Sequence, residues 1–267
     1  MLDYFEMSAD PRLHSFIRKF WILENPYEIS ATKFALPNTC ITLAIVSGSG
    51  LIIDFKGRTS HLTSGSYLVG ELTTRVGVTV LPNSRAFMVQ LNPWAASLLS
   101  RCSYHELVNQ CSPLVDINKT LGAAFQKIDI LDYKTTKQQI QKAIEDYLYP
   151  TTSSLFIEKC FFLFNSHSLA IPFKLDNLCL ATGFTVRSIE KKFRQHVGLT
   201  PKQAFSINNV RKVVNELSES DGDLSLTDIS YKYGYFDQAH FTKSYYSIMD
   251  SLPSKFGVTP YLLPFKT

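Results

Sequence analysis

The chain has 267 residues, which is long enough for two domains that each have a hydrophobic core. Apolar residues make up 45% of the chain and aromatic residues 13%, so the composition favours a globular protein over a disordered one. The formal net charge is only +4, and charge alone therefore does not indicate a nucleic-acid partner. The sequence contains no run of eighteen apolar residues and does not begin with a signal-peptide pattern, so we expect a cytoplasmic protein without membrane contact.

The cysteines are odd in number, widely scattered and without a CxxC pair. They are Cys40, Cys102, Cys111, Cys160 and Cys179. This pattern favours buried thiols in a reducing cytosol over disulfides or a zinc site.

Two kinds of local pattern follow each other in the first 150 residues. Residues 11–23 carry apolar residues at helical spacing after a proline suited to a first turn, and we expect a helix there. Residues 35–92 are β-rich, because short apolar runs alternate with turn signals. These runs are Cys40–Val46, Leu51–Phe55, Tyr67–Val69, Val76–Leu81 and Ala86–Leu91. Many short strands with regular breaks predict a β-sandwich or small barrel. Residues 93–149 return to helical spacing, in Trp94–Ser100 and Lys134–Leu148.

The β-rich segment lacks the residues of a metal-dependent enzyme, which needs several histidines and a carboxylate converging inside the barrel. His61 is its only histidine, while His14, His105 and His167 are isolated elsewhere, so we expect no metal and no cofactor. An apolar interior could instead hold an apolar or amphipathic effector. The candidate wall residues are Phe34, Ile41, Leu43, Ile53, Tyr67, Phe87 and Met88. The alternative, that these residues simply fill the core, stays open.

Residues 149–154 carry turn and cap residues without apolar periodicity and mark the expected domain boundary. Beyond them the periodicity is helical throughout. The expected helices are 155–168, 174–182, 186–197, 202–218, 225–233, 238–248 and a short one starting near Pro253. The predicted class is therefore α+β, with an effector-sensing or dimerisation domain over 1–150 and an all-helical domain over 155–267.

The last ninety or so residues contain one pattern twice. The first copy runs Leu178, Gly183, Ile189, Phe193, Gly198 and Pro201, and the second runs Ile229, Gly234, Phe241, Tyr245, Asp250 and Pro253. The two copies are offset by 51 positions up to the glycine and by 52 after it, because one residue is inserted after Gly234. A glycine between two short helices is typical of a helix-turn-helix unit, whose second helix enters the DNA major groove. Two such units, 174–197 and 225–248, joined by a helix over 202–218, predict a DNA-binding protein.

In the first unit Thr185 is suited to cap the second helix, and Ile189 and Phe193 form its buried stripe. The remaining faces carry the side chains Arg187, Ser188, Glu190, Lys191, Lys192 and Arg194. Arginine can bridge guanine and lysine can neutralise phosphates, although a basic helix face is often only a solvated surface. In the second unit the exposed set is Gln238, Ala239, His240, Thr242 and Lys243, and Gln238 is suited to adenine.

These residues resemble the AraC/XylS transcriptional regulators. The second unit reads Gly234-Tyr-Phe-Asp-Gln-Ala-His-Phe241-Thr-Lys-Ser-Tyr245, and the resemblance covers about residues 155–262. It implies a bacterial regulator that binds double-stranded promoter DNA, usually as an activator touching RNA polymerase. It also implies that the base-facing residues are Arg187, Ser188, Glu190 and Lys191 in one unit and Gln238, Ala239, His240 and Lys243 in the other. Residues 35–92 are similar to the cupin-like sensor domain that many such regulators carry.

The sequence departs from the family pattern at four positions. Asn209 replaces an arginine of the linker helix, with Arg211 nearby. Phe236 occupies the usual small-polar cap position, so we expect Asp237 to be the cap. Asp250 replaces a glycine, and Leu252 replaces a serine or threonine before Pro253.

Two other classes of protein compete with this interpretation. One is a small-molecule carrier or cupin-type enzyme with an appended helical domain, but no catalytic cluster or nucleotide fingerprint is present. The other is a DNA-repair protein with a four-cysteine zinc site, against which the scattered cysteines argue. The sequence leaves open the sign of regulation, the effector and whether the protein forms a homodimer.

Overall fold

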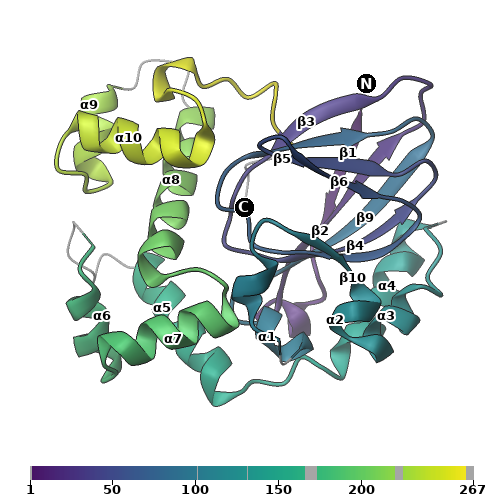
Figure 1. Cartoon of the computed structure of the whole chain (residues 1–267), viewed down its shortest axis with the longest axis horizontal. Coiled ribbons are helices and arrows are strands. Elements are labelled where there is room, and N and C mark those ends of the chain that lie inside the picture. Colours follow the sequence, from purple (N-terminus) through teal and green to yellow (C-terminus); the bar gives the residue numbers. More distant parts are fainter. Residues whose placement is uncertain (1, 101, 131, 166–172, 220–224, 263–267) are drawn as a thin grey trace.

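The computed structural model describes residues 2–100, 102–130, 132–165, 173–219 and 225–262. A β-rich N-terminal half lies beside a helical C-terminal half, as Figure 1 shows. The predicted α+β class is confirmed. The β-rich half is a sandwich, because its two sheets do not close into a barrel.

The strands form a six-stranded and a four-stranded sheet. Their bounds are β1 Asp3–Met7, β2 Ile17–Asn25, β3 Ala31–Ala35, β4 Thr42–Ser47, β5 Leu51–Phe55, β6 Arg58–Leu62, β7 Gly65–Val69, β8 Val76–Val80, β9 Ser84–Leu91 and β10 Cys111–Pro113. The larger sheet has the order β1-β2-β9-β4-β7-β10, and the smaller has the order β3-β8-β5-β6. All of their strand pairs are antiparallel. The five strands expected between residues 40 and 91 are present, at slightly different bounds.

The prediction of a helix over residues 11–23 is wrong. The segment forms a short 3-10 turn, Pro11–Leu13, and then the nine-residue strand β2, which pairs along β9. Phe20 and Ile22 pack against the helices outside the sheet, whereas Trp21 and Leu23 pack inside the sandwich. A strand buried on both faces has a continuous apolar run instead of an alternating one, and such a run also satisfies helical spacing.

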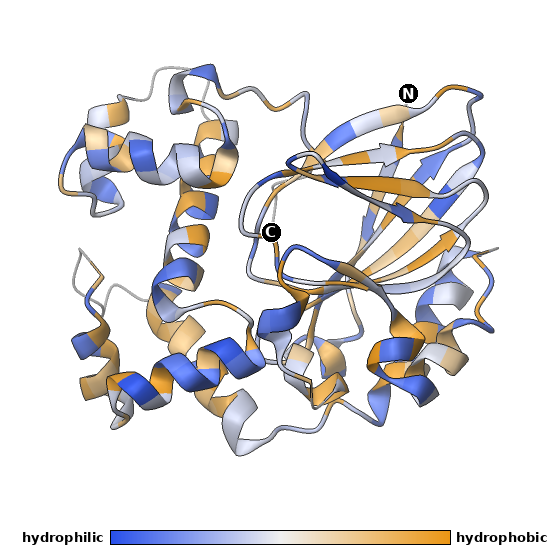
Figure 2. Ribbon diagram, viewed as in Figure 1, coloured by the Kyte–Doolittle hydropathy of each residue, from blue (hydrophilic) through white to orange (hydrophobic). Residues whose placement is uncertain are grey.

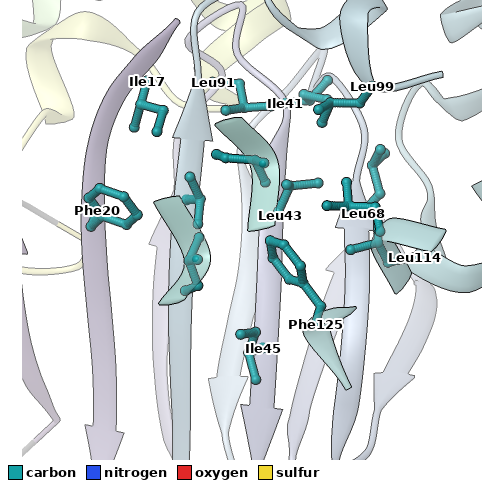
Figure 3. Packing of buried hydrophobic residues seen from close by; sticks show 14 of the residues in the cluster. Ile17, Phe20, Ile41, Leu43, Ile45, Leu68, Leu91, Leu99, Leu114 and Phe125 are labelled. Carbon is teal, nitrogen blue, oxygen red and sulfur yellow. The ribbon is translucent and has the colours of Figure 1, made fainter. Parts of the chain in front are cut away.

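Four helices cover the outer face of the six-stranded sheet. They are α1 Ala96–Leu99, α2 Leu114–Ile117, α3 Lys119–Phe125 and α4 Tyr133–Glu145. Figure 3 shows Leu114 and Phe125 of these helices against Leu43 and Leu68 of the strands. This helix-covered core is distinct from the smaller cluster between the two sheets.

Three of the expected wall residues face this outer core. Ile41, Leu43 and Phe87 all belong to the cluster under the helices. The prediction that they line the interior of the sandwich is therefore wrong. The cause is strand alternation, because a shift of one residue moves a side chain to the opposite face of the sheet. Ile53 and Met88 do lie between the sheets.

The C-terminal half consists of helices over most of its length. Their bounds are α5 Thr152–Asn165, α6 Leu175–Thr182, α7 Val186–His196, α8 Pro201–Glu219, α9 Leu226–Lys232, α10 Gln238–Met249 and a 3-10 turn Pro253–Lys255. The helices expected in this half are present among the described residues, although α5 begins inside the segment 149–154 and the element at Pro253 is only a 3-10 turn. The end of the helix expected over 155–168, with His167, lies outside the described residues.

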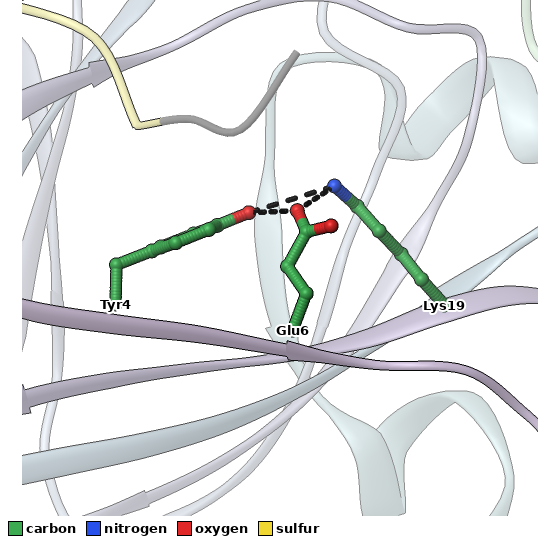
Figure 4. Close-up of polar contacts among 3 residues, drawn as sticks. All are labelled: Tyr4, Glu6 and Lys19. Carbon is green, nitrogen blue, oxygen red and sulfur yellow. Dashed lines mark hydrogen bonds and ion pairs between the residues drawn. The ribbon is translucent and has the colours of Figure 1, made fainter. Parts of the chain in front are cut away.

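A partly buried polar cluster lies where the larger sheet approaches α8. The Tyr4 hydroxyl and the Lys19 ammonium both donate to the Glu6 carboxylate, as Figure 4 shows. Burial lowers the pKa of Lys19 even though Glu6 opposes this shift. The charge of Arg211 on α8 acts on both Tyr4 and Lys19. Burial, together with the nearby Arg18, lowers the pKa of Arg211 to about 10. The linker helix is therefore electrostatically coupled to the β-rich half.

Glu71, between β7 and β8, is buried, and its carboxyl oxygens find no hydrogen-bond partner among the described residues. Burial raises its pKa well above the ordinary 4.5. The folded protein then keeps a proton that the unfolded chain releases. We therefore expect the free energy of unfolding to fall as pH rises from about 4.5 towards the raised pKa. Glu71→Gln should be more stable than the wild type at pH 8, with a smaller difference at pH 5, in urea unfolding.

The exposed Glu28 supplies a matched control for this prediction. Glu28→Gln should track the wild type at both pH values. A stability difference for Glu71→Gln that is equal at pH 5 and pH 8 would show that Glu71 is not protonated in the folded state.

Candidate nucleic-acid interface

The first helix-turn-helix unit consists of α6 and α7. Gly183 ends α6 in the left-handed conformation, with a φ of 75°, which a glycine adopts without steric cost. The Thr185 hydroxyl accepts a hydrogen bond from the Ser188 amide at 3.3 Å and so caps α7, as its sequence position predicts. Ile189 and Phe193 are fully buried. These contacts fix which face of α7 points to solvent.

Most of the α7 ribbon has the hydrophilic colour in Figure 2. A shallow groove on the outer face of this helix is lined by Arg187, Glu190, Lys191, Arg194 and Gln195 of α7 and by Ser103. Residues three and four apart share one side of a helix, so the first four of these point the same way. The structure thus brings together four of the six side chains expected to contact DNA in the first unit.

The other two side chains lie to the side of this groove. Ser188 is half-buried near the start of α7. The Lys192 ammonium lies 5.5 Å from the ring centroids of both Phe156 and Phe184, a cation–π arrangement that directs it towards α5. Lys192 therefore stands at the edge of the surface rather than at its centre.

The second unit, α9 and α10, repeats this construction. Gly234 has a φ of 74°, and the Asp237 carboxylate caps α10 by accepting from the His240 amide at 2.7 Å. Phe241 and Tyr245 are fully buried. Asp237 is therefore the cap, as the sequence predicts for a unit with phenylalanine at position 236.

A second groove lies on the outer face of α10. It is lined by Gln238, Ala239, Thr242, Lys243, Tyr246 and Leu252. The Gln238 side-chain oxygen accepts a hydrogen bond from the Thr227 hydroxyl of α9 at 3.1 Å, which orients the amide. His240 lies outside this groove, because its ring packs against Tyr235 at 5.4 Å. Tyr246 and Leu252 were not expected from the sequence.

The helix α8 holds the two units at its two ends, as Figure 1 shows. It has 19 residues, which at 1.5 Å each span about 28 Å. Asn209, in place of the family's arginine, donates from its side-chain amide to the Tyr233 carbonyl at 2.8 Å, at the end of α9. Ser206 of α8 lies 3.2 Å from Ser244 of α10. The linker is therefore hydrogen-bonded to the second unit and acts as a spacer of defined length.

Asp250 connects the second unit to the β-rich half. It has a φ of 51°, so it adopts the left-handed conformation for which the family pattern has glycine. Its carboxylate lies 3.6 Å from the Lys56 ammonium and 3.9 Å from the Arg75 guanidinium. The Arg75 amide also donates to the Ile248 carbonyl at 2.8 Å. The end of α10 is thus fixed to two loops of the sandwich.

The β-rich half also contacts the first unit. The 3-10 helix Tyr104–Leu107 packs against α7, and His105 Nδ1 lies 3.1 Å from the Gly198 carbonyl. Gly198 has a φ of 90°, and a Cβ placed there would lie 2.7 Å from the Tyr104 carbonyl oxygen. A glycine at this position therefore permits both the turn and the close approach of the two halves.

Gly198→Ala is expected to destabilise the protein more than Gly183→Ala does. Both glycines have a positive φ, which costs an alanine about 1–2 kcal/mol, but a Cβ at Gly183 meets nothing within 4 Å. The difference between the two variants isolates the collision with Tyr104. Urea unfolding of the full chain measures both, and equal losses would mean that the contact between the halves contributes nothing.

A cavity of about 60 Å³ lies at the end of the sandwich. Ile53 and Met88 are the two expected wall residues that line it, and Asn38, Thr42 and Gln90 add polar groups. Of the other expected wall residues, Phe34 packs against Tyr261 and Tyr67 against the edge of the inner core. A water molecule needs about 10–15 Å³ of such volume, so the cavity has room for a few waters or a small ligand group.

Within the described ranges no three histidine, cysteine or acidic residues are grouped as metal ligands would be. The five cysteines are free thiols. Among the helices that the structure describes, none combines the length and apolarity needed to cross a bilayer.

A family model described as a helix-turn-helix domain matches residues 178–257, which span both units. The doubled unit and this match together identify residues 178–257 as a helix-turn-helix domain of the AraC/XylS type.

A second model, described as a domain of unknown function, matches residues 5–113. No curated protein matches the sequence. Among solved structures, an apo form of ToxT from Vibrio cholerae is 14% identical, with a TM-score of 0.47 over 93% of this chain and 98% of that one. Another crystal form of ToxT is 12% identical, with a TM-score of 0.47 over 96% of each chain. The AraC-like transcriptional activator CuxR is 8% identical, with a TM-score of 0.31 over 79% of this chain and 85% of that one.

Proposed function

We propose that the protein activates transcription by binding a specific promoter sequence, with α7 and α10 in two adjacent segments of the major groove. The observation that supports this most is the pair of exposed helix faces at the two ends of α8, each fixed by a buried apolar stripe on the opposite side of its helix. A spacer of about 28 Å is close to the roughly 34 Å of one DNA turn. Two recognition helices so spaced can reach the same side of one duplex.

The two faces supply both kinds of contact that such a protein needs. In the first unit Arg187 and Lys191 are assigned to base edges, with Glu190 and Ser188 beside them, and Arg194 to phosphate. Lys192 is assigned to phosphate at the flank of the surface. In the second unit the base-facing set is Gln238, Ala239, Thr242 and Lys243, and His240 is assigned to the flank. Phosphate contacts give affinity and salt dependence, whereas base contacts give specificity.

The N-terminal half is assigned the control of DNA binding. The proposed division is a sensing or dimerisation domain over 1–150 and a DNA-binding domain over 155–267, within a cytoplasmic bacterial protein that is not an enzyme. The cavity in the sandwich suits a small apolar or amphipathic effector. An effector can act only if it binds the active and inactive arrangements with different affinity. RNA polymerase is the expected partner of the bound activator, and a homodimer would raise the effective concentration of the second DNA-binding half.

Selection of binding sequences from a random DNA pool by the full-length protein tests this function. We expect enrichment of a site with two informative blocks, and affinity that falls steeply with salt. The slope of the logarithm of affinity against the logarithm of salt concentration should correspond to several phosphate contacts. A folded protein that enriches no sequence, or whose binding does not change with salt, would contradict the proposal.

A further inference from the structure

The two exposed helix faces differ in the chemistry of their side chains. The groove of α7 presents two arginines, a lysine and a glutamate, with Gln195 in the last turn of the helix, away from the end that meets base edges, and Ser103 beside it. The groove of α10 presents an amide at Gln238, methyl groups at Ala239 and Thr242, and a single cation at Lys243. The units share one backbone construction, so this contrast lies in their side chains and not in their fold.

In the major groove these two sets fit opposite base pairs. Arginine and lysine donate to guanine O6 and N7, and glutamate accepts from the amino group of cytosine. Glutamine pairs with adenine N6 and N7, while the methyl groups of alanine and threonine pack against the thymine methyl. The face of α7 is thus built for G·C pairs, and the face of α10 is built for A·T pairs.

Phe236 adds a large apolar group beside the α10 face. One extra residue follows Gly234 relative to the first unit, and both residues before the cap are aromatic. Tyr235 turns inward and packs on Phe241 at 5.2 Å, which leaves Phe236 outside and 83% exposed. Phenylalanine is a side chain that packs against the thymine methyl in the major groove.

The first unit shows that this exposure is not a general property of the position. Phe184 also stands directly before its helix cap, but it is only 38% exposed. The Phe156 ring of α5 covers it at 4.8 Å in an edge-to-face contact. Within the described part of the chain, no aromatic ring covers Phe236 in this way. The second unit therefore leaves a phenylalanine open at the end of its recognition helix.

The location of Phe236 decides which partner it fits. It stands two residues before Gln238, and the Asp237 cap between them fixes the backbone at the N-terminal end of α10. In a helix-turn-helix protein this end of the recognition helix contacts the base edges. The Thr227 hydroxyl holds Gln238 at the same end. Phe236 and Gln238 are therefore placed to contact neighbouring positions of one DNA segment.

We propose that the protein reads a bipartite site of opposite composition, with G·C pairs under α7 and A·T pairs under α10, and that Phe236 contacts a thymine methyl in the second segment. This inference rests on the proposed DNA-binding function. It adds the base composition of each segment and a specificity-determining residue, Phe236, to that function.

Selected DNA sites first show whether the two blocks differ in composition. Repeating the selection with Arg187→Ala and with Gln238→Ala assigns each block to a unit, because each variant relaxes the preference of its own block. We expect the Arg187→Ala selection to lose a G·C preference and the Gln238→Ala selection to lose an A·T preference. Two blocks of the same composition would overturn the inference while leaving the proposed function intact.

Removing single thymine methyl groups then tests Phe236. Each thymine of the α10 block is replaced in turn by deoxyuridine, and binding of the full chain is measured. We expect one replacement to weaken wild-type binding about three- to fourfold, which is the effect of one buried methyl group. Phe236→Ala should bind thymine and deoxyuridine at that position equally well. Replacing guanine by 7-deazaguanine in the α7 block should weaken the wild type but not Arg187→Ala.

Phe162, which is 72% exposed on α5, supplies the matched control. Phe162→Ala should keep the wild-type response to deoxyuridine. The assignment would be overturned if Phe236→Ala still bound the thymine site more tightly than the deoxyuridine site by the wild-type factor. Unchanged DNA binding with lost activation would also overturn it, because Phe236 would then contact a protein. The absence of any salt-sensitive DNA binding would instead contradict the proposed function.

Discussion

Arg187→Ala is expected to weaken binding to the selected site by about 1–3 kcal/mol and to relax discrimination at one base pair. Arg187 lies in the groove of α7 near its N-terminal end, where a recognition helix meets base edges. Its guanidinium can donate two hydrogen bonds to one guanine, and no other base offers the same pair of acceptors. Titrations against the selected site and its three single-base variants at that position measure both effects.

Two other cations give the comparison that this prediction needs. Arg194→Ala, about two turns further along the same face of α7, should weaken binding to all sequences and reduce the salt slope by about one, as expected for a phosphate contact. Lys142→Ala, on the exposed side of α4, should change neither affinity nor slope. If Arg187→Ala lost affinity uniformly for all sequences, as Arg194→Ala is expected to do, Arg187 would contact phosphate and not a base.

Phe193→Ala is expected to lower the free energy of unfolding by about 3–5 kcal/mol. Phe193 is fully buried in α7, and its ring centroid lies 6.1 Å from that of Phe161 and 6.0 Å from that of Phe164. Truncation leaves a cavity between α5 and α7 and removes the contacts that hold the recognition helix in place. Urea unfolding of the full chain measures the loss.

The exposed Phe162, next to Phe161 on the same helix, is the control for this variant. Phe162→Ala should change the free energy of unfolding by no more than about 0.5 kcal/mol, because its side chain is largely in solvent. A loss below about 1 kcal/mol for Phe193→Ala would show that the packing of α7 on α5 does not stabilise the domain.

The helical half could be predicted from sequence because its signals are local. Thr185 and Asp237 each cap a helix through a bond to an amide three residues later. Gly183 and Gly234 supply the positive φ that each turn requires. Apolar residues four apart mark one buried face in each unit. Each of these signals acts within one or two helical turns and is therefore visible in the order of residues.

The β-rich half could be predicted only in part, because its pattern depends on distant partners. The strand β2 is covered by helices on one face and by the second sheet on the other. The sequence does not show that both faces are buried, and the continuous apolar run of this segment therefore predicts a helix. Strands β1 and β10 fall outside the expected β-rich range, and β3 meets it only at Ala35. The place of Phe87 under the helices follows from strand register, which the pairing with β4 decides.

The sequence predicts the residues of the DNA-facing surface better than their arrangement on it. Four expected residues share the groove of α7, and four share that of α10. Lys192 and His240 lie to the side, because neighbouring aromatic rings hold them. In the sequence Phe236 is a departure from the family's small-polar cap position, and its exposure is visible only in the structure. Ser103, at the rim of the first groove, comes from the other half of the chain, and no local signal could have placed it there.

The reading of two DNA segments by two helices is tested most directly by hydroxyl-radical footprinting of the full-length protein on its selected site. We predict two protected blocks on the same side of the duplex, with centres about one turn, roughly 10 base pairs, apart. Gln238→Ala should weaken protection of one block while the other remains. A single protected block in the wild type would contradict the account. The account would also be contradicted if the Gln238 variant lost both blocks in parallel at concentrations that saturate the first unit.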